Sequence, residues 1–315
     1  MTNDYDFLKR SKLFKNEKDI QSVVKISENK YKINDKDNKS YIFALCDMDH
    51  HELITNEEFL QDILRNIGLI PLEIYEEGIM PDLNKAYKIF EYRKEKSLKE
   101  FLSTSSAENQ FEIGKNFGSL LEKFHKSKIT ENVDWEKKFL TKSNYLFYIH
   151  GLSEDIGDRD YILIDYIQDN IHLTKNTPIN LLHGKINDRN IRIYDDNKLD
   201  FRGLKEIDYG DGVFDFVDIN KIAIDYPKFA QGVLDGYFNG KRPSRKFFRL
   251  LSLYQAYVIL YNKVDKNANK DHNLDDNQIN DLMQMYDEFN RLLPDWVKWY
   301  GGCCIYCEYN ILFLY

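Results

Sequence analysis

The sequence predicts an α+β fold in two lobes, a small β-rich lobe followed by a large and mainly helical one. Short runs of β-branched and aromatic residues dominate the first hundred residues, whereas apolar residues at helical spacing dominate the rest. The 315 residues are enough for about two domains, and 43% hydrophobic residues provide for a sizeable core. We expect a first lobe over 1–93, a second over 94–300, and an apolar, cysteine-containing tail over 301–315.

Strand-like runs and one helix are expected in the first lobe. Turn-forming residues at 35–39 separate the second and third runs, which predicts a hairpin. A capping sequence at 55–58 precedes apolar residues at helical spacing, and Gly68 ends this helix. The strand-like runs are 21–26, 30–33, 40–45, 72–75 and 86–92.

The second lobe is expected to contain several helices and a few short strands. An apolar stripe over 111–124 predicts a long helix that ends near His125, which we interpret as a packed core histidine rather than a ligand. Further helices and strands follow from the same periodicities. The strands are expected at 181–183, 191–194 and 204–207, and the helices at 218–239, 244–265 and 275–300.

Composition excludes several classes of partner and location. The net charge of −8 argues against nucleic acid, because binding to phosphates needs a basic surface. The N-terminal residues show no signal peptide, and no run approaches the roughly 18 apolar residues of a membrane span. We therefore expect a cytoplasmic protein that does not bind membranes. Oligomeric state is not predicted.

Three of the four cysteines, Cys303, Cys304 and Cys307, lie in the tail. A thiolate metal site is one interpretation of this cluster. A closed zinc site needs four ligands, however, and no histidine follows His272. We favour the other interpretation, an apolar tail without a metal.

The most informative stretch is the loop that begins at His183-Gly184 and ends at Asn190, followed by a second polar turn that contains Asp208 and Asp215. This pattern resembles the catalytic loop and the metal-binding turn of the aminoglycoside-phosphotransferase and choline-kinase-like family. That family is a two-lobed relative of the protein kinases. The order and spacing of further segments, at 88–98, 113–125 and 227–238, are similar to the family as well.

The resemblance implies a nucleotide site built by the first lobe, with ATP or GTP as the nucleotide. In the family, hinge residues contact adenine, a loop covers the phosphates, and a lysine on the third strand pairs with a helix glutamate. Transferred to this sequence, Glu91 and Tyr92 line the adenine pocket and Ser27 and Asn29 belong to the loop. The glutamate is Glu58, or Glu57 if the register slips by one residue.

The resemblance also implies roles for residues of the second lobe. Asn190 and Asp208 are the expected ligands of Mg²⁺, which prefers oxygen. Asp215 is expected to brace the catalytic loop, and His183 to be structural. A small-molecule acceptor is the expected second substrate.

Three departures from the family pattern affect the nucleotide. Ala44 stands where the strand lysine is expected, and the loop at 26–30 contains no glycine, which would allow close approach to phosphate. The third departure is Lys185, at the position of the family's catalytic aspartate.

An ammonium group at Lys185 cannot act as the base, and the neighbouring carboxylates Asp208 and Asp211 favour its charged form. We predict that Lys185 pairs with Asp208 and weakens Mg²⁺ binding. Asp188, in the same loop, is a possible substitute base. The alternative that we favour is an exposed aspartate in a turn with Asn187.

Three functions are consistent with these residues. The favoured one is a catalytically impaired, pseudokinase-type member of the family, with weak or metal-independent nucleotide binding. The alternative is an active ATP- and Mg²⁺-dependent O-phosphotransferase acting on a small hydroxylated, possibly cationic molecule similar to an aminoglycoside. The third is an interaction protein that keeps only the fold and uses its C-terminal helices and tail as an interface.

Overall fold

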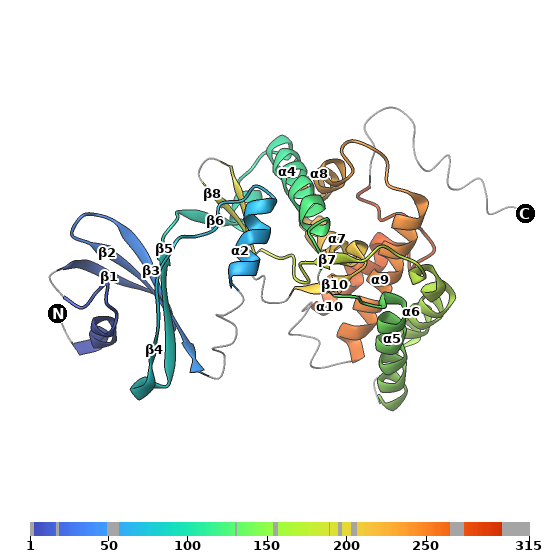
Figure 1. The fold of residues 1–315 in the computed structure, drawn as a ribbon. Coiled ribbons are helices and arrows are strands. Elements are labelled where there is room, and N and C mark those ends of the chain that lie inside the picture. The colour runs from blue at the N-terminus through green and yellow to red at the C-terminus, as the bar shows by residue number, and fades with distance from the viewer. Residues whose placement is uncertain are drawn as a thin grey trace, which may run out of the picture. The chain divides into compact units, whose positions relative to one another are not determined.

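The computed structural model describes residues 3–16, 19–48, 57–129, 131–153, 157–188, 190–194, 197–202, 207–264 and 274–297. The chain divides into two compact units, Met1–Glu95 and Lys96–Tyr315. The first carries the antiparallel sheet and the second most of the helices, in agreement with the predicted α+β class (Figure 1). The predicted tail at 301–315 lies outside the described residues.

The first unit is built on a five-stranded antiparallel sheet in the order β1-β2-β3-β5-β4. The predicted hairpin is present between β2 and β3, where the carboxylate of Asp35 accepts hydrogen bonds from the backbone N–H groups of Asp37 and Lys39. Its strands are β1 (Ile20–Ser27), β2 (Lys30–Asp35), β3 (Ser40–Asp47), β4 (Ile74–Met80) and β5 (Lys85–Glu91).

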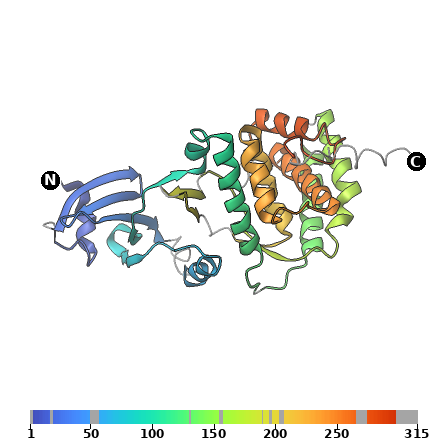
Figure 2. The same ribbon diagram turned by 90° about the horizontal axis from the view of Figure 1, so that it is seen from above.

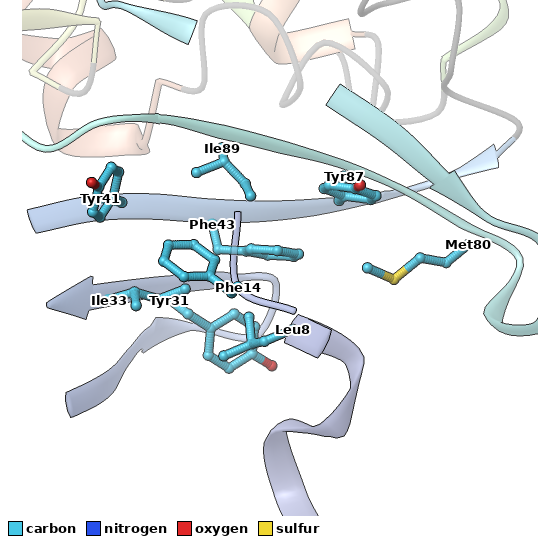
Figure 3. Close-up of a cluster of buried hydrophobic side chains, with 9 residues drawn as sticks. All are labelled: Leu8, Phe14, Tyr31, Ile33, Tyr41, Phe43, Met80, Tyr87 and Ile89. Atoms are coloured by element: carbon cyan, nitrogen blue, oxygen red, sulfur yellow. The ribbon is translucent and has the colours of Figure 1, made fainter. Parts of the chain in front are cut away.

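One face of this sheet carries an aromatic core (Figure 3). Leu8, in the 3₁₀ helix η1 (Asn3–Arg10), and Phe14 pack on it and are almost fully buried. The rings of Phe43 and Tyr87 stack there at 5.2 Å between centroids. Each fully buried side chain of this size contributes about 1.5–3 kcal/mol, so the N-terminal segment is a structural part of the unit.

The predicted helix and the predicted fourth strand of the first unit are both present, the strand with shifted bounds. The predicted helix is present as α2 (Glu57–Asn66), and Gly68 follows it with φ +93°. The strand expected at 72–75 instead begins at Ile74 and continues to Met80, because its pairing with β5 extends to Lys85. The capping residues at 55–56 and the side chains of Glu57 and Glu58 lie outside the described part of the chain.

The second unit combines helices with short strands. The strand β6 (Glu95–Ser97) leads into it and forms a small sheet in the order β6-β8-β9, and β10 pairs with β7. The strands are β7 (Asn180–Leu182), β8 (Ile191–Tyr194), β9 (Leu199–Phe201) and β10 (Asp208–Gly210). The helices are α3 (Leu98–Leu102), α4 (Ala107–His125), α5 (Trp135–Leu152), α6 (Asp158–Asn170), α7 (Phe216–Asp225), α8 (Pro227–Tyr237), α9 (Arg245–Val264) and α10 (Asp276–Met285).

Helix α9 is the centre of the second unit, because every side chain from Phe247 to Leu260 except Arg249 is buried. The helix expected over 275–300 is shorter than predicted. It ends at Met285, and Asp287, Glu288 and Phe289 then adopt left-handed backbone angles that no α-helix can contain. Among the helices that the structure describes, none combines the length and apolar character that a bilayer crossing needs.

Helices α4 and α8 lie side by side and approach each other through glycines on both helices (Figure 2). A methyl group on Gly114 or Gly118 of α4 would overlap with the backbone of α8, and one on Gly232 or Gly236 of α8 would overlap with α4. The glycines are four residues apart on each helix and therefore share one face. Their small size fixes the separation of the two helices.

We expect Gly118→Ala to destabilise the protein by about 1–3 kcal/mol, because the added methyl group overlaps with the backbone carbonyl oxygen of Val233. Thermal unfolding followed by circular dichroism measures the change. The matched control is Gly151→Ala near the end of α5, where an added Cβ meets nothing within 4 Å. This control should be neutral or stabilising by up to about 1 kcal/mol. Equal stability of the Gly118 variant and the parent would contradict the close approach.

Candidate functional site

The candidate site is the loop between β7 and β8, which runs from His183 to Asn190. Strand β10 pairs antiparallel with β7, so that Asp208 lies opposite Leu182. This pairing brings Asp208 next to the start of the loop, although the two are distant in sequence. The structure thus gathers the predicted residues of the second unit into one region.

Asp215 holds the beginning of this loop. Its Oδ2 accepts hydrogen bonds from the backbone N–H of His183 at 2.7 Å and from Nε2 of His125 at 3.0 Å, and its Oδ1 accepts one from the N–H of Gly184 at 2.9 Å. Burial acts to raise the pKa of this carboxyl, but the hydrogen bond and charge of His125 outweigh it and the pKa is lowered. The carboxylate is therefore ionised and fixes two consecutive backbone groups.

His125 is buried, in keeping with the core interpretation, and it also has polar partners. Its Nδ1 lies 2.8 Å from the hydroxyl of Tyr237 at the end of α8, and its Nε2 contacts Asp215. The sequence pattern did not indicate these bonds. Apolar periodicity predicts that His125 is buried, but it does not identify the partners of the two ring nitrogens. His125 links the close pair of helices α4 and α8 to the loop.

His183 is neutral in this arrangement. Its Nε2 lies 2.9 Å from the carbonyl oxygen of Arg202, and its Nδ1 accepts the N–H of Lys185 at 3.3 Å. One ring nitrogen donates and the other accepts, which is the pattern of a single neutral tautomer. Burial lowers the pKa of His183. Its neighbour Gly184 has φ +76°, a left-handed angle that favours glycine at this turn.

The end of the loop is held by two side chains that bond to its backbone. Nδ2 of Asn190 donates to the carbonyl oxygen of Lys185 at 3.0 Å, and the Asn190 N–H donates to Oδ1 of Asn187 at 3.1 Å. Oδ2 of Asp218 accepts the N–H of Ile186 at 2.8 Å. Asp218 was not among the predicted residues. Asp188 is exposed in the same turn, and its role as a substitute base stays a prediction.

Asp208 binds a lysine that the sequence analysis missed. Nζ of Lys138, on α5, lies 2.5 Å from Oδ1 and 2.6 Å from Oδ2 of Asp208. The ammonium group thus contacts both oxygens of the expected metal ligand. The predicted pairing of Lys185 with Asp208 stays a prediction. No local pattern could have indicated Lys138, because it precedes Asp208 by 70 residues.

These residues do not fit a preformed Mg²⁺ site. Carboxylate and amide oxygens are suitable ligands, but the Asp208 carboxylate is already neutralised by an ammonium group on both of its oxygens. A cation at Asp208 would therefore compete with the ammonium group of Lys138.

Asp211 belongs to a buried hydrogen-bond network. Its Oδ2 accepts the hydroxyl of Tyr254 at 2.8 Å, its Oδ1 accepts the N–H of Val213 at 3.0 Å, and burial raises the pKa of the carboxyl. Tyr254 in turn accepts the indole N–H of Trp135 at 2.8 Å. This buried chain of bonds connects the turn after β10 to helices α9 and α5.

The remaining predicted residues lie in the first unit. Ser27 and Asn29 are at the tip of the β1–β2 hairpin, where the carbonyl oxygen of Asn29 accepts the N–H of Leu45 at 2.8 Å. Ala44 is half-buried in β3. They share the sheet with the predicted adenine-binding residues.

Glu91 and Tyr92 lie at the end of β5. The carboxylate of Glu91 binds Nη2 of Arg93 at 2.7 Å, and this bond, despite an opposing effect of burial, lowers its pKa. Nζ of Lys32 lies 3.8 Å from the ring centroid of Tyr92, a cation–π contact. Glu91 is thus engaged within the unit, and the ammonium group of Lys32 lies over the ring face of Tyr92.

We expect acid to destabilise the protein in part through His183. Because burial lowers the pKa of His183 in the folded protein, the unfolded chain binds more protons below its ordinary pKa of about 6.5. Stability should therefore fall as pH decreases from 7 towards 5, as measured by urea unfolding. His183→Gln should reduce this slope, whereas His172→Gln, at an exposed position, should keep it. Equal slopes for the parent and His183→Gln would contradict the assignment.

No protein-family model and no curated protein matches the sequence. Solved structures do match its fold. A thermostable mutant of aminoglycoside phosphotransferase APH(4)-Ia, in a ternary complex with ADP and hygromycin B, has a TM-score of 0.61 at 12% identity and covers 90% of this chain and 98% of its own. The APH(2")-IIa complex with streptomycin and ATP has a TM-score of 0.55 at 18% identity and covers 90% and 97%.

A choline kinase is similar as well. LicA from Streptococcus pneumoniae has a TM-score of 0.53 at 13% identity and covers 91% of this chain and 97% of its own. These identities are low, so the likeness concerns the fold. The predicted α+β, two-lobed class is confirmed: the chain has the protein-kinase-like fold of aminoglycoside phosphotransferases and choline kinases.

Proposed function

We propose that this chain is a catalytically impaired, pseudokinase-type phosphotransferase homologue that binds a nucleotide weakly and without metal. The observation that carries the proposal is the ammonium group of Lys138 on both oxygens of Asp208. A second lysine, Lys185, stands where the resemblance places the catalytic aspartate. Of the two positions where the resemblance expects carboxylates, one therefore carries a lysine and the other a carboxylate that is paired with a lysine.

The chemistry of the loop supports binding rather than transfer. When Mg²⁺ is bound in a kinase, it neutralises charge that develops on the transferred phosphoryl group. Here the charge that faces a phosphate would come from lysines. An ammonium group can pair with phosphate as a point charge. It cannot accept the proton of an attacking hydroxyl, so the acceptor remains a poor nucleophile.

The comparisons support the nucleotide part of the proposal. Structures of similar fold are complexes with AMP-PNP, ADP or ATP. The loop geometry is consistent with this, because Asp215, Asn190 and their backbone bonds form a fixed loop regardless of the side chain at 185.

The second candidate is an active ATP- and Mg²⁺-dependent O-phosphotransferase for a small hydroxylated molecule, neutral or cationic. The retained Asn190, Asp208 and Asp215 favour it. Similar structures contain hygromycin B, streptomycin or gentamicin, which are small polyhydroxylated molecules. In this case Asp188 would act as the base, and Lys138 would leave Asp208 when the metal binds.

Metal dependence of ATP binding separates the two candidates. We expect calorimetric titration of ATP into the parent protein to give the same affinity with Mg²⁺ and with EDTA, within about twofold. A Lys138→Met/Lys185→Asp double variant should bind ATP at least about tenfold more tightly with Mg²⁺ than with EDTA, a difference of about 1.4 kcal/mol. The physical reason is that the oxygen ligands lose their competing ammonium group and gain a carboxylate.

Lys137→Met is the matched control, because it removes the same charge from the same helix at an exposed position. It should keep the metal independence of the parent. If the parent itself binds ATP tenfold more tightly with Mg²⁺, the proposal is wrong and the active phosphotransferase is favoured. Asp188→Asn would then be the first variant to assay for transfer.

A further inference from the structure

The register of the first sheet places lysines on both sides of Ala44. Lys30 of β2 and Lys88 of β5 are each paired with Ala44 of β3, and Glu77 of β4 is paired with Lys88. Paired residues on neighbouring antiparallel strands point to the same face, with their Cβ atoms about 4.5–5.5 Å apart. The four residues therefore form one row across the sheet, with cations next to the position where the resemblance expects one.

This row lies on the face away from the aromatic core. Tyr31, Phe43 and Tyr87, which belong to that core, are each next in sequence to a member of the row. Because side chains alternate between the faces of a strand, Lys30, Ala44 and Lys88 point to the other face. Figure 3 shows the core side of the same strands.

The neighbouring row on this second face is mostly apolar. It contains Val24, Lys32, Ile42 and Phe90, paired in that order across β1, β2, β3 and β5. Val24 of this row is 54% exposed, whereas Ile42 is only 9% exposed. An apolar surface of this kind suits a nucleotide base. Its member Phe90 precedes Glu91, the first predicted adenine-binding residue, whose own side chain points to the core face.

The distance between the hinge and the lysine row suits a nucleotide. Lys88 precedes Glu91 by three residues on the same strand, which corresponds to about 10 Å at about 3.4 Å per residue. A base placed at the hinge would thus have its outer phosphates near the row that contains Ala44. Because the side chains of Glu91 and Lys88 point to opposite faces of the sheet, a base on the face of Lys88 would contact the hinge through its backbone.

Lys88 is the better fixed of the two lysines. Its Nζ lies 2.7 Å from Oε1 of Glu77, and its side chain is only 12% exposed. Nζ itself is buried, so a phosphate would have to displace the groups that cover it. Lys30 is exposed at the hairpin tip and would lose more side-chain entropy on binding a phosphate. An ammonium group already held by a carboxylate on the next strand is oriented before the ligand arrives.

We propose that Lys88, held by Glu77, binds the outer phosphates of the nucleotide in place of the lysine expected at Ala44. This inference rests on the nucleotide binding proposed above. The lysine–carboxylate pair then lies within the sheet, on adjacent strands.

The test compares ATP with AMP in the presence of EDTA, by calorimetry on the full chain. Lys88→Met should weaken ATP binding about tenfold or more, the usual effect of losing one charge-assisted hydrogen bond, and change AMP binding less than about twofold. Returning the lysine to the neighbouring strand in an Ala44→Lys/Lys88→Met variant should restore ATP binding. Lys88→Arg, which keeps the charge, should retain most of it.

Lys85→Met is the matched control. Lys85 lies on the same strand but on the face of Tyr87, and its Nζ binds Oδ1 of Asp47 at 2.6 Å. Its removal changes the net charge equally and should leave both affinities unchanged. Ala44→Glu provides a second test that keeps Lys88 in place, because a carboxylate beside Lys88 should compete with phosphate and weaken ATP binding.

The outcomes separate this inference from the proposed function. If the parent binds ATP but Lys88→Met leaves the ratio of ATP to AMP affinity unchanged, the role of Lys88 is wrong and nucleotide binding stands. A larger loss in Lys30→Met than in Lys88→Met would also overturn it. If the parent binds neither nucleotide, the proposed function itself fails.

Discussion

The candidate site depends on the hydrogen bonds that the carboxylate of Asp215 accepts. This carboxylate receives the N–H groups of His183 and Gly184 together with Nε2 of His125, and it does so in a fully buried position. A buried carboxylate without these donors would be strongly destabilising. The loop therefore cannot leave this conformation without exposing or orphaning a charge. Lys185 follows Gly184 directly, so these hydrogen bonds also set the direction of the backbone at Lys185.

The close approach of α4 and α8 at their glycines positions His125, the third hydrogen-bond donor to Asp215. His125 ends α4 and Tyr237 ends α8, and their side chains bond to each other at 2.8 Å. A wider separation of the helices would move the imidazole away from both Tyr237 and Asp215. None of these contacts involves the side chain at 185. The loop can therefore keep this conformation with a lysine at the position where the resemblance expects the catalytic aspartate.

The fold could be predicted from local patterns, and the site only in part. Alternation in β2 and β3 and the turn after Asp35 were enough for the hairpin, and the spacing from His183 to Asn190 was enough for the loop. Lys138 could not be found, because its partner Asp208 is brought near it by packing rather than by sequence. Lys88 was visible as a residue, but its place opposite Ala44 requires the strand register. The end of α10 at Met285 was missed for a similar reason, since helical periodicity continues past it while the backbone does not.

Three lysines bring positive charge to positions that the resemblance assigns to the catalytic base, the metal and the phosphates. Lys185 replaces an expected carboxylate, Lys138 neutralises Asp208, and Lys88 stands beside the alanine that replaces an expected lysine. A nucleotide without Mg²⁺ carries more negative charge than its magnesium complex, so ammonium groups can replace part of the metal's attraction in the bound ground state. Catalysis needs more than this attraction, because only interactions that strengthen in the transition state accelerate transfer. A proton acceptor is such an interaction, and a lysine ammonium is not. Under the proposed function, the same lysines would therefore support nucleotide binding in the absence of metal without supporting turnover.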